Sequence, residues 1–172
     1  MDGLRIGLDD PRADDIRELL AVHLTFARSE RLPQDAHALD VGDLVNPSIT
    51  FVSARNGCQL LAVGALREID DEHGEIKSMH TSHAARGQGI GASVLTYLVD
   101  IARERAYRRV SLETGSDSMF VPARSLYAKA GFVLCEPFGD YRESPTSTYM
   151  TLELAGVQCG PRPRSTPVSG GG

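Results

Sequence analysis

The sequence predicts a mixed α/β fold in which a largely antiparallel, twisted sheet is flanked by helices. The 172 residues, 41% of them hydrophobic, suffice for one sizeable core. Three apolar runs separated by turn signals predict an antiparallel meander in the first half of the chain. In the second half, a glycine-rich segment opens an amphipathic helix between two strands, which predicts a βαβ crossover. The predicted order is strand, helices, three strands, helix, strand, helix and two strands.

The first predicted strand covers residues 4–8, and a helix is expected directly after it. Asp10 can cap this helix, with Pro11 at the first helical position, where proline is favoured. Side chains at helical spacing then form one inward stripe: Ile16, Leu19, Leu20, His23 and Leu24. A second, short helix is expected near residues 36–44.

The meander is predicted from strand-like runs at residues 49–54, 60–69 and 75–81. Asn56-Gly57 separates the first two runs, and this dipeptide favours a tight hairpin. The acidic segment DDEHG separates the second and third runs.

After the glycine-rich segment, a long amphipathic helix is expected to end near Arg105. A strand at residues 108–113 and a short helix at residues 122–130 follow, with Gly131 in the C-cap position. The final strands are predicted at residues 132–136 and 147–154. Residues 155–172 are rich in Pro, Gly and Ser and are predicted to be a disordered tail, so the single domain is expected to span residues 1–154.

Composition excludes several classes of protein. The net charge of −5 argues against nucleic acid as the main partner, because phosphate binding needs a clustered basic surface. No apolar run approaches the ~20 residues that a membrane span needs. Cys58, Cys135 and Cys159 lack metal-type spacing and are read as reduced thiols of a cytoplasmic protein.

Residues 85–95 read ARGQGIGASVL and begin a helix directly after a strand. Alternating glycines expose backbone N–H groups there, and the positive end of the helix dipole adds to them, so an anion such as a phosphate or pyrophosphate fits. A P-loop is excluded because no lysine follows the glycines. A dinucleotide fingerprint remains an alternative, although Gly91 comes one position too early for it.

Two segments together resemble a known family. Residues 86–91, RGQGIG, are similar to the R/Q-x-x-G-x-G/A signature, and residues 123–132, ARSLYAKAGF, to the A-x-x-L-Y-x-x-x-G-F element, of the GNAT superfamily. These are the acetyl-CoA-dependent N-acetyltransferases. The resemblance covers about residues 4–154, points most closely to an uncharacterised bacterial branch, and implies the GNAT acyltransferase fold with acetyl-CoA as co-substrate and no metal.

In such enzymes, backbone amides of the glycine loop hold the CoA pyrophosphate. The matching residues are Arg86, Gly87, Gln88, Gly89, Ile90, Gly91 and Ala92, with Ser93 nearby. The family's preceding strand splays from its neighbour. The resemblance therefore implies that backbone groups of Met79, His80 and Thr81 pair with the pantetheine arm like an added strand.

The resemblance also suggests catalytic residues. Tyr127 matches the family tyrosine near the sulfur, and a phenol with a reference pKa of about 10 can protonate a leaving thiolate. The general base stays open among Glu75, Glu113 and His80, each of which could instead be an ordinary strand residue.

One position departs from the family pattern, and the residues that bind the acceptor have no motif of their own. Phe120 stands where an asparagine often contacts the pantetheine, so that contact is lost, made by Ser118 or Asp117, or made by backbone alone. Asp140 and Glu143, between the last two strands, are candidates to attract a cationic amine.

The sequence thus predicts an N-acetyltransferase that moves an acetyl group from acetyl-CoA to a primary amine of a small molecule or amino acid derivative. Direct attack is expected because no nucleophile suits a covalent route. Besides the nucleotide-binding alternative, two others stay open: a non-catalytic acyl-CoA-binding or sensor module, and an acetyltransferase acting on a protein or peptide amine. A homodimer is also open.

Overall fold

Seven strands form one sheet in the computed structural model, which describes residues 3–28 and 39–154. The order across the sheet is β1-β2-β3-β4-β5-β7-β6. Each neighbouring pair is antiparallel except β4 and β5, which are parallel and joined by the predicted βαβ crossover. The predicted fold class is therefore confirmed.

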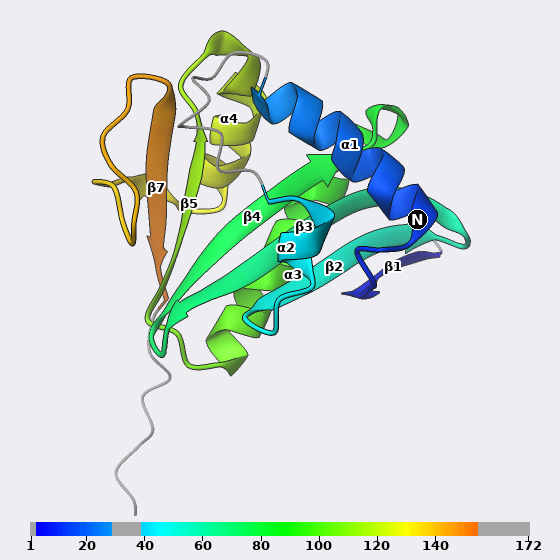
Figure 1. Ribbon diagram of the computed structural model, residues 1–172, viewed down its shortest axis with the longest axis horizontal. Helices are drawn as coiled ribbons and strands as arrows, with labels where there is room; N and C mark the ends of the chain where they lie inside the picture. Colours follow the sequence, from blue (N-terminus) through cyan, green and yellow to red (C-terminus); the bar gives the residue numbers. More distant parts are fainter. Residues whose placement is uncertain (1–2, 29–38, 155–172) are drawn as a thin grey trace, which may run out of the picture.

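The described elements follow the predicted order (Figure 1). The strands are β1 (Leu4–Leu8), β2 (Ile49–Asn56), β3 (Gln59–Asp70), β4 (His73–Thr81), β5 (Arg109–Gly115), β6 (Val133–Leu134) and β7 (Ser147–Glu153). The helices are α1 (Asp14–Arg28), α2 (Val41–Leu44), α3 (Ile90–Glu104) and α4 (Val121–Lys129), with the 3₁₀ turns η2 (His83–Ala85) and η3 (Ser118–Phe120).

Helices cover both faces of the sheet. Figure 1 shows α1 and α2 on one face and α3 on the other. The larger core lies on the α3 face, where Val94 and Leu98 are fully buried against strand residues such as Leu66. A smaller core under α1 and α2 includes Ile16 and Leu20. None of the helices in the described ranges is long and apolar enough to span a membrane.

The pairing between β4 and β5 ends halfway along these strands. Their last paired residues are Ile76 and Leu112, although β4 continues to Thr81 and β5 to Gly115. Beyond that point β4 stays paired with β3, and β5 stays paired with β7. The two parts of the sheet therefore diverge and leave backbone groups of β4 without a partner strand on the β5 side.

A β-bulge accompanies this divergence. The register between β3 and β4 shifts between Val63 and Ala65, and Ser78 of β4 has φ of +53°, a left-handed conformation that is unusual for a residue other than glycine. The bulge changes the direction of β4 at the level where it leaves β5.

Two predicted boundaries were wrong. The helix after β1 begins at Asp14 rather than behind an Asp10 cap, because the Asp10 carboxylate accepts a hydrogen bond from the Arg12 backbone N–H (2.9 Å) and closes a turn instead. The strand predicted at residues 132–136 is only Val133–Leu134, an exposed edge strand that pairs with β7 over two residues.

The second short helix is α2, capped by Asp40 through a capping box with Asp43. Residues 36–38 of that prediction, and the tail predicted at residues 155–172, lie outside the described residues. The remaining boundaries agree to within two residues. The C-cap of α4 is Ala130, and the predicted Gly131 follows it by one residue, with φ of +95°.

Gly64 lets α3 approach the sheet beside the bulge. A Cβ added there would lie 2.7 Å from Met79 Sδ, 2.9 Å from Val94 Cγ1 and 3.0 Å from Leu98 Cδ1. We therefore expect Gly64→Ala to lower the free energy of unfolding by about 1–3 kcal/mol in urea denaturation. The matched control is Gly7→Ala on β1, where a Cβ would meet nothing within 4 Å and stability should change little. Wild-type stability of Gly64→Ala would contradict this account of the packing.

Candidate active site

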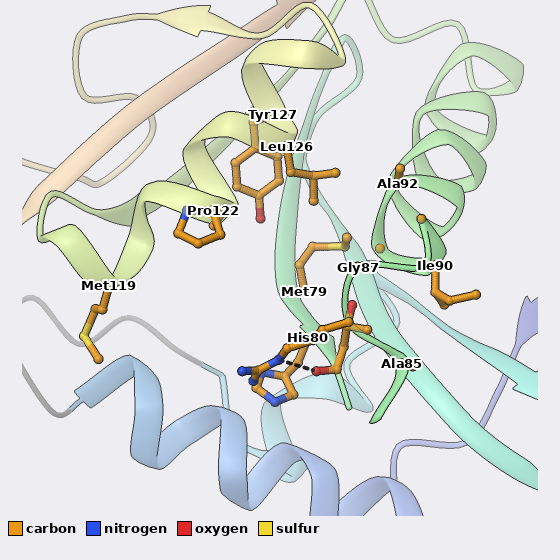
Figure 2. Close-up of a pocket in the computed structure, with 15 residues that line it drawn as sticks. Met79, His80, Ala85, Gly87, Ile90, Ala92, Met119, Pro122, Leu126 and Tyr127 are labelled. Carbon is orange, nitrogen blue, oxygen red and sulfur yellow. Dashed lines mark hydrogen bonds between the residues drawn. The ribbon is translucent and has the colours of Figure 1, made fainter. Parts of the chain in front are cut away.

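A cavity of about 450 Å³ opens where β4 leaves β5. Its walls come from the end of β4, the segment that leads into α3, and helix α4 (Figure 2). Ten of the predicted cofactor-binding and catalytic residues line it: Met79, His80, Thr81, Arg86, Gly87, Gly89, Ile90, Gly91, Ala92 and Tyr127.

The glycine loop forms one end of this cavity. Gly87 and Gly89 have φ of +73° and +79°, and a Cβ added at either would meet nothing within 4 Å. Gly89 is the N-cap of α3, so the first N–H groups of that helix have no partner within the helix. The loop thus presents backbone donors and a helix dipole to open space, which suits an anion.

Two predicted loop residues do not line the cavity. Gln88 Nε2 donates a hydrogen bond to the Ala84 carbonyl oxygen (2.8 Å), and Ser93 Oγ donates to the Gly89 carbonyl oxygen (3.3 Å). Their side chains therefore support the loop, and their predicted contribution to cofactor binding rests on their backbone groups.

Arg86 and His80 both line the cavity, Arg86 as an exposed residue and His80 as a buried one. Arg86 Nε donates to the Thr81 carbonyl oxygen at 3.4 Å, the hydrogen bond dashed in Figure 2. Burial, and then the positive charge of Arg86, lowers the pKa of His80 to about 4. His80 also packs edge-on against His23 of α1, with ring centroids 5.3 Å apart.

Tyr127 closes the inner end. Its ring is buried and tilted against Phe132, and Figure 2 shows its hydroxyl directed into the cavity toward Met79. Burial, and then the negative charge of Glu113, raises the pKa of Tyr127. The phenol therefore keeps its proton across the neutral range and can donate it.

Phe120 does not replace the family's asparagine as a cavity residue. It is buried, and its ring fills the space beside Gly115, where an added Cβ would clash with the ring. Met119 and Pro122 line this side of the cavity instead.

Glu75 is held in a polar cluster on the α1 face of the sheet. Its carboxylate is fully buried, and Oε1 accepts hydrogen bonds from Lys77 Nζ (2.9 Å) and Tyr141 Oη (2.5 Å). Lys77 Nζ also donates to Tyr141 Oη (2.8 Å), and Arg67 Nε lies 3.5 Å from Glu75 Oε2. We call Arg67, Glu75, Lys77 and Tyr141 the Glu75 cluster.

Glu113 lies on the same face of β5 but is partly exposed. Its Oε1 accepts a hydrogen bond from Ser147 Oγ (2.7 Å), and its charge contributes to the raised pKa of Tyr127. Of the two predicted carboxylates, Glu113 is therefore linked electrostatically to the inner end of the cavity, whereas Glu75 is bound within its own cluster.

The loop between β6 and β7 packs onto this face through aromatic rings. Phe138 contacts Tyr141 and Tyr149, with centroids 5.1 Å and 6.1 Å apart. Asp140 and Glu143, the acceptor candidates from the sequence, are exposed. Two side chains of this loop reach β4: Phe138 contacts His73, with ring centroids 5.5 Å apart, and Tyr141 hydrogen-bonds with Glu75 and Lys77.

Sequence reasoning missed three residues of the Glu75 cluster. Glu75-x-Lys77 could have been noticed, because residues two apart on a strand share a face. Arg67 and Tyr141 gave no local signal, since their contacts with Glu75 depend on strand register and on a contact 66 residues away in sequence.

Residues 13–132 match the acetyltransferase (GNAT) family. The chain belongs to this family and is an acyltransferase. The predicted resemblance is thereby confirmed.

Two bacterial relatives match almost the whole domain. One is the uncharacterized N-acetyltransferase YsnE of Bacillus subtilis, 44% identical over 88% of this chain and 100% of its own. The other is the uncharacterized N-acetyltransferase YedL of Escherichia coli, 40% identical over 87% of this chain and 94% of its own.

Solved structures share the fold. A Bacillus subtilis acetyltransferase in complex with CoA superimposes with a TM-score of 0.66 at 19% identity, over 88% of this chain and 99% of that one. A GNAT acetyltransferase of Elizabethkingia anophelis with acetyl-CoA bound gives a TM-score of 0.65 at 22% identity, over 90% of this chain and 100% of that one.

The depressed pKa of His80 predicts a pH-dependent loss of stability. An unfolded histidine titrates near about 6.5, so below that pH the unfolded chain binds a proton that the folded chain, with a pKa of about 4, does not. The free energy of unfolding should therefore fall with pH, by about 2 kcal/mol from this residue between about pH 7.5 and 5.

Urea denaturation at both pH values tests this prediction. His80→Gln should lose about 2 kcal/mol less than the wild type over that interval. His83→Gln, which removes an exposed histidine nearby, should keep the wild-type dependence. Identical pH dependence in His80→Gln and wild type would contradict the prediction.

Proposed function

We propose that this protein transfers an acetyl group from acetyl-CoA to a primary amine of a small molecule or amino acid derivative by direct attack. One observation carries the proposal. A single cavity joins an anion-accepting glycine loop at one end to a protonated tyrosine at the other. The solved GNAT structures with CoA or acetyl-CoA bound support the choice of co-substrate.

The residues present fit acetyl-CoA. Backbone N–H groups from Gly87 to Ala92 would hold the pyrophosphate, since open space adjoins both left-handed glycines. The end of β4, from Met79 to Thr81, has lost its pairing with β5 and offers backbone groups to an extended arm. When bound, acetyl-CoA supplies the activated acetyl thioester.

Tyr127 serves as the general acid in this proposal. In the overall exchange the amine nitrogen forms the new bond to the acetyl carbon, the carbon–sulfur bond breaks, and the amine proton is lost while the thiolate gains one. Tyr127 donates that proton from the inner end of the cavity. Its raised pKa keeps the donor protonated at neutral pH.

Glu113 is the better-placed base of the two carboxylates, because it is partly exposed and close enough to Tyr127 to influence its titration. Glu75 is fully buried, and its Oε1 already accepts two hydrogen bonds, so we assign it to positioning Tyr141 and Lys77. With a pKa of about 4, His80 is neutral at physiological pH but is a weak proton acceptor.

Release of CoA thiol, measured across a panel of amino acids, polyamines, aminoglycosides and peptides, tests the function. Tyr127→Phe should lower kcat by about 100-fold or more, while the affinity for CoA changes little, because only the proton donor is removed. Tyr97→Phe on α3, outside the cavity, is the matched control and should retain wild-type turnover.

The outcomes separate the alternatives. CoA binding without thiol release for any amine would favour a non-catalytic acyl-CoA-binding module. Turnover with peptides alone would favour the peptide-amine alternative. Unchanged kcat in Tyr127→Phe would overturn the acid assignment. Glu113→Gln should lower kcat most at low pH, where the amine is protonated, and an equal effect at all pH values would contradict a base role.

A further inference from the structure

The Glu75 cluster carries one more positive charge than its carboxylate can balance. Lys77 Nζ and Tyr141 Oη both bind Glu75 Oε1, so the lysine and the carboxylate form a closed, buried pair. Burial, and then the charge of Glu75, raises the pKa of Tyr141, whose phenol therefore remains the donor in this arrangement. Arg67 adds a second cation to the same single carboxylate.

The Arg67 guanidinium has N–H donors beyond the one that approaches Glu75. Its only ion-pair contact to a described residue is the 3.5 Å approach of Nε to Glu75 Oε2, and that oxygen is buried without a hydrogen bond. The Arg67 side chain keeps 33% of its surface exposed, whereas Lys77 keeps 7%. A guanidinium has a planar fork that matches the two oxygens of a carboxylate, so Arg67 can bind an anion from solvent while the Lys77 pair stays closed.

Arg67 lies on the same face of the sheet as Glu113, the proposed base beside Tyr127. Arg67 pairs in register with Glu75, and Glu75 with Ser111, so Arg67 lies in the row of side chains just below Glu113 on the same face. Neighbouring strands are about 4.8 Å apart, which separates the β3 and β5 backbones by roughly 10 Å. Glu113 follows Ser111 by two residues on β5 and lies one position past the last paired residue, Leu112, so Arg67 and Glu113 lie on the same face next to the point where β4 leaves β5.

We propose that Arg67 binds a carboxylate of the acceptor, so that the acceptor is a small amino acid whose amine faces Glu113 and Tyr127. This inference rests on the proposed function. Arg67 selects among amines through an anionic group that polyamines and aminoglycosides lack. Lys77, Glu75 and Tyr141 act as positioning residues, because their hydrogen bonds hold the β6–β7 loop against β4.

Matched acceptor triplets test the inference in the thiol-release assay: an amino acid, its carboxamide and the amine left by decarboxylation. The wild type should prefer the free amino acid in kcat/KM by about 10- to 100-fold, the size expected for hydrogen bonds to a charged group. The carboxamide is a stringent comparison, because its amine is the less basic and so is more readily deprotonated.

Arg67→Gln should abolish the preference by raising KM for the free amino acid, so that kcat/KM for the free amino acid falls by about 10-fold or more relative to kcat/KM for the carboxamide. Arg67→Lys, which keeps the charge but loses the fork, should restore part of the preference. Arg103→Gln is the matched control, because Arg103 is an exposed arginine on α3, on the opposite face. Unchanged CoA affinity of Arg67→Gln shows that the variant is folded.

Two results would overturn the inference while leaving the proposed function intact: equal turnover of all three members of each triplet by the wild type, or an equal loss on all three in Arg67→Gln. Absence of thiol release with every amine would instead overturn the proposed function, and this inference with it.

Discussion

The candidate site depends on the loss of pairing between β4 and β5 beyond Ile76 and Leu112. Both strands keep their outer partners, so the divergence costs hydrogen bonds only along the line where they separate. The left-handed Ser78 in the bulge and the Phe120 ring beside Gly115 occupy the two sides of this opening. A glycine loop and a buried tyrosine can then face one cavity from elements distant in sequence.

The two faces of the sheet differ in character: the α3 face is packed by apolar side chains, and the α1 face carries a polar cluster. On the α3 face, apolar packing against Gly64 holds the helix whose first turn forms the proposed pyrophosphate site. On the α1 face, Glu75 and Lys77 are buried, and their hydrogen bonds with Tyr141 hold the β6–β7 loop against β4. A buried carboxylate is tolerated there because Lys77 and Arg67 accompany it. In our proposal, Arg67 of this cluster binds the carboxylate of the acceptor.

Much of the fold was predictable because its signals are local. Asn56-Gly57, the apolar periods and the alternating glycines each act over a few residues, and the two family motifs identified the cavity walls. The start of α1 was wrong because a side-chain turn at Asp10 competes with a helix cap over the same residues. Arg67 and Tyr141 were not predictable, since strand register and a loop returning to β4 bring them to Glu75.

Ligand-dependent thermal stability tests the central claim, that this cavity is built for an acyl-CoA, most directly. CoA, acetyl-CoA, NAD and ATP would each be added at equal concentration to the wild-type protein. A ligand at about 100 times its Kd stabilises the folded state by about 2.7 kcal/mol, so CoA and acetyl-CoA should raise Tm clearly while NAD does not. A raised Tm with NAD and none with CoA would contradict the account.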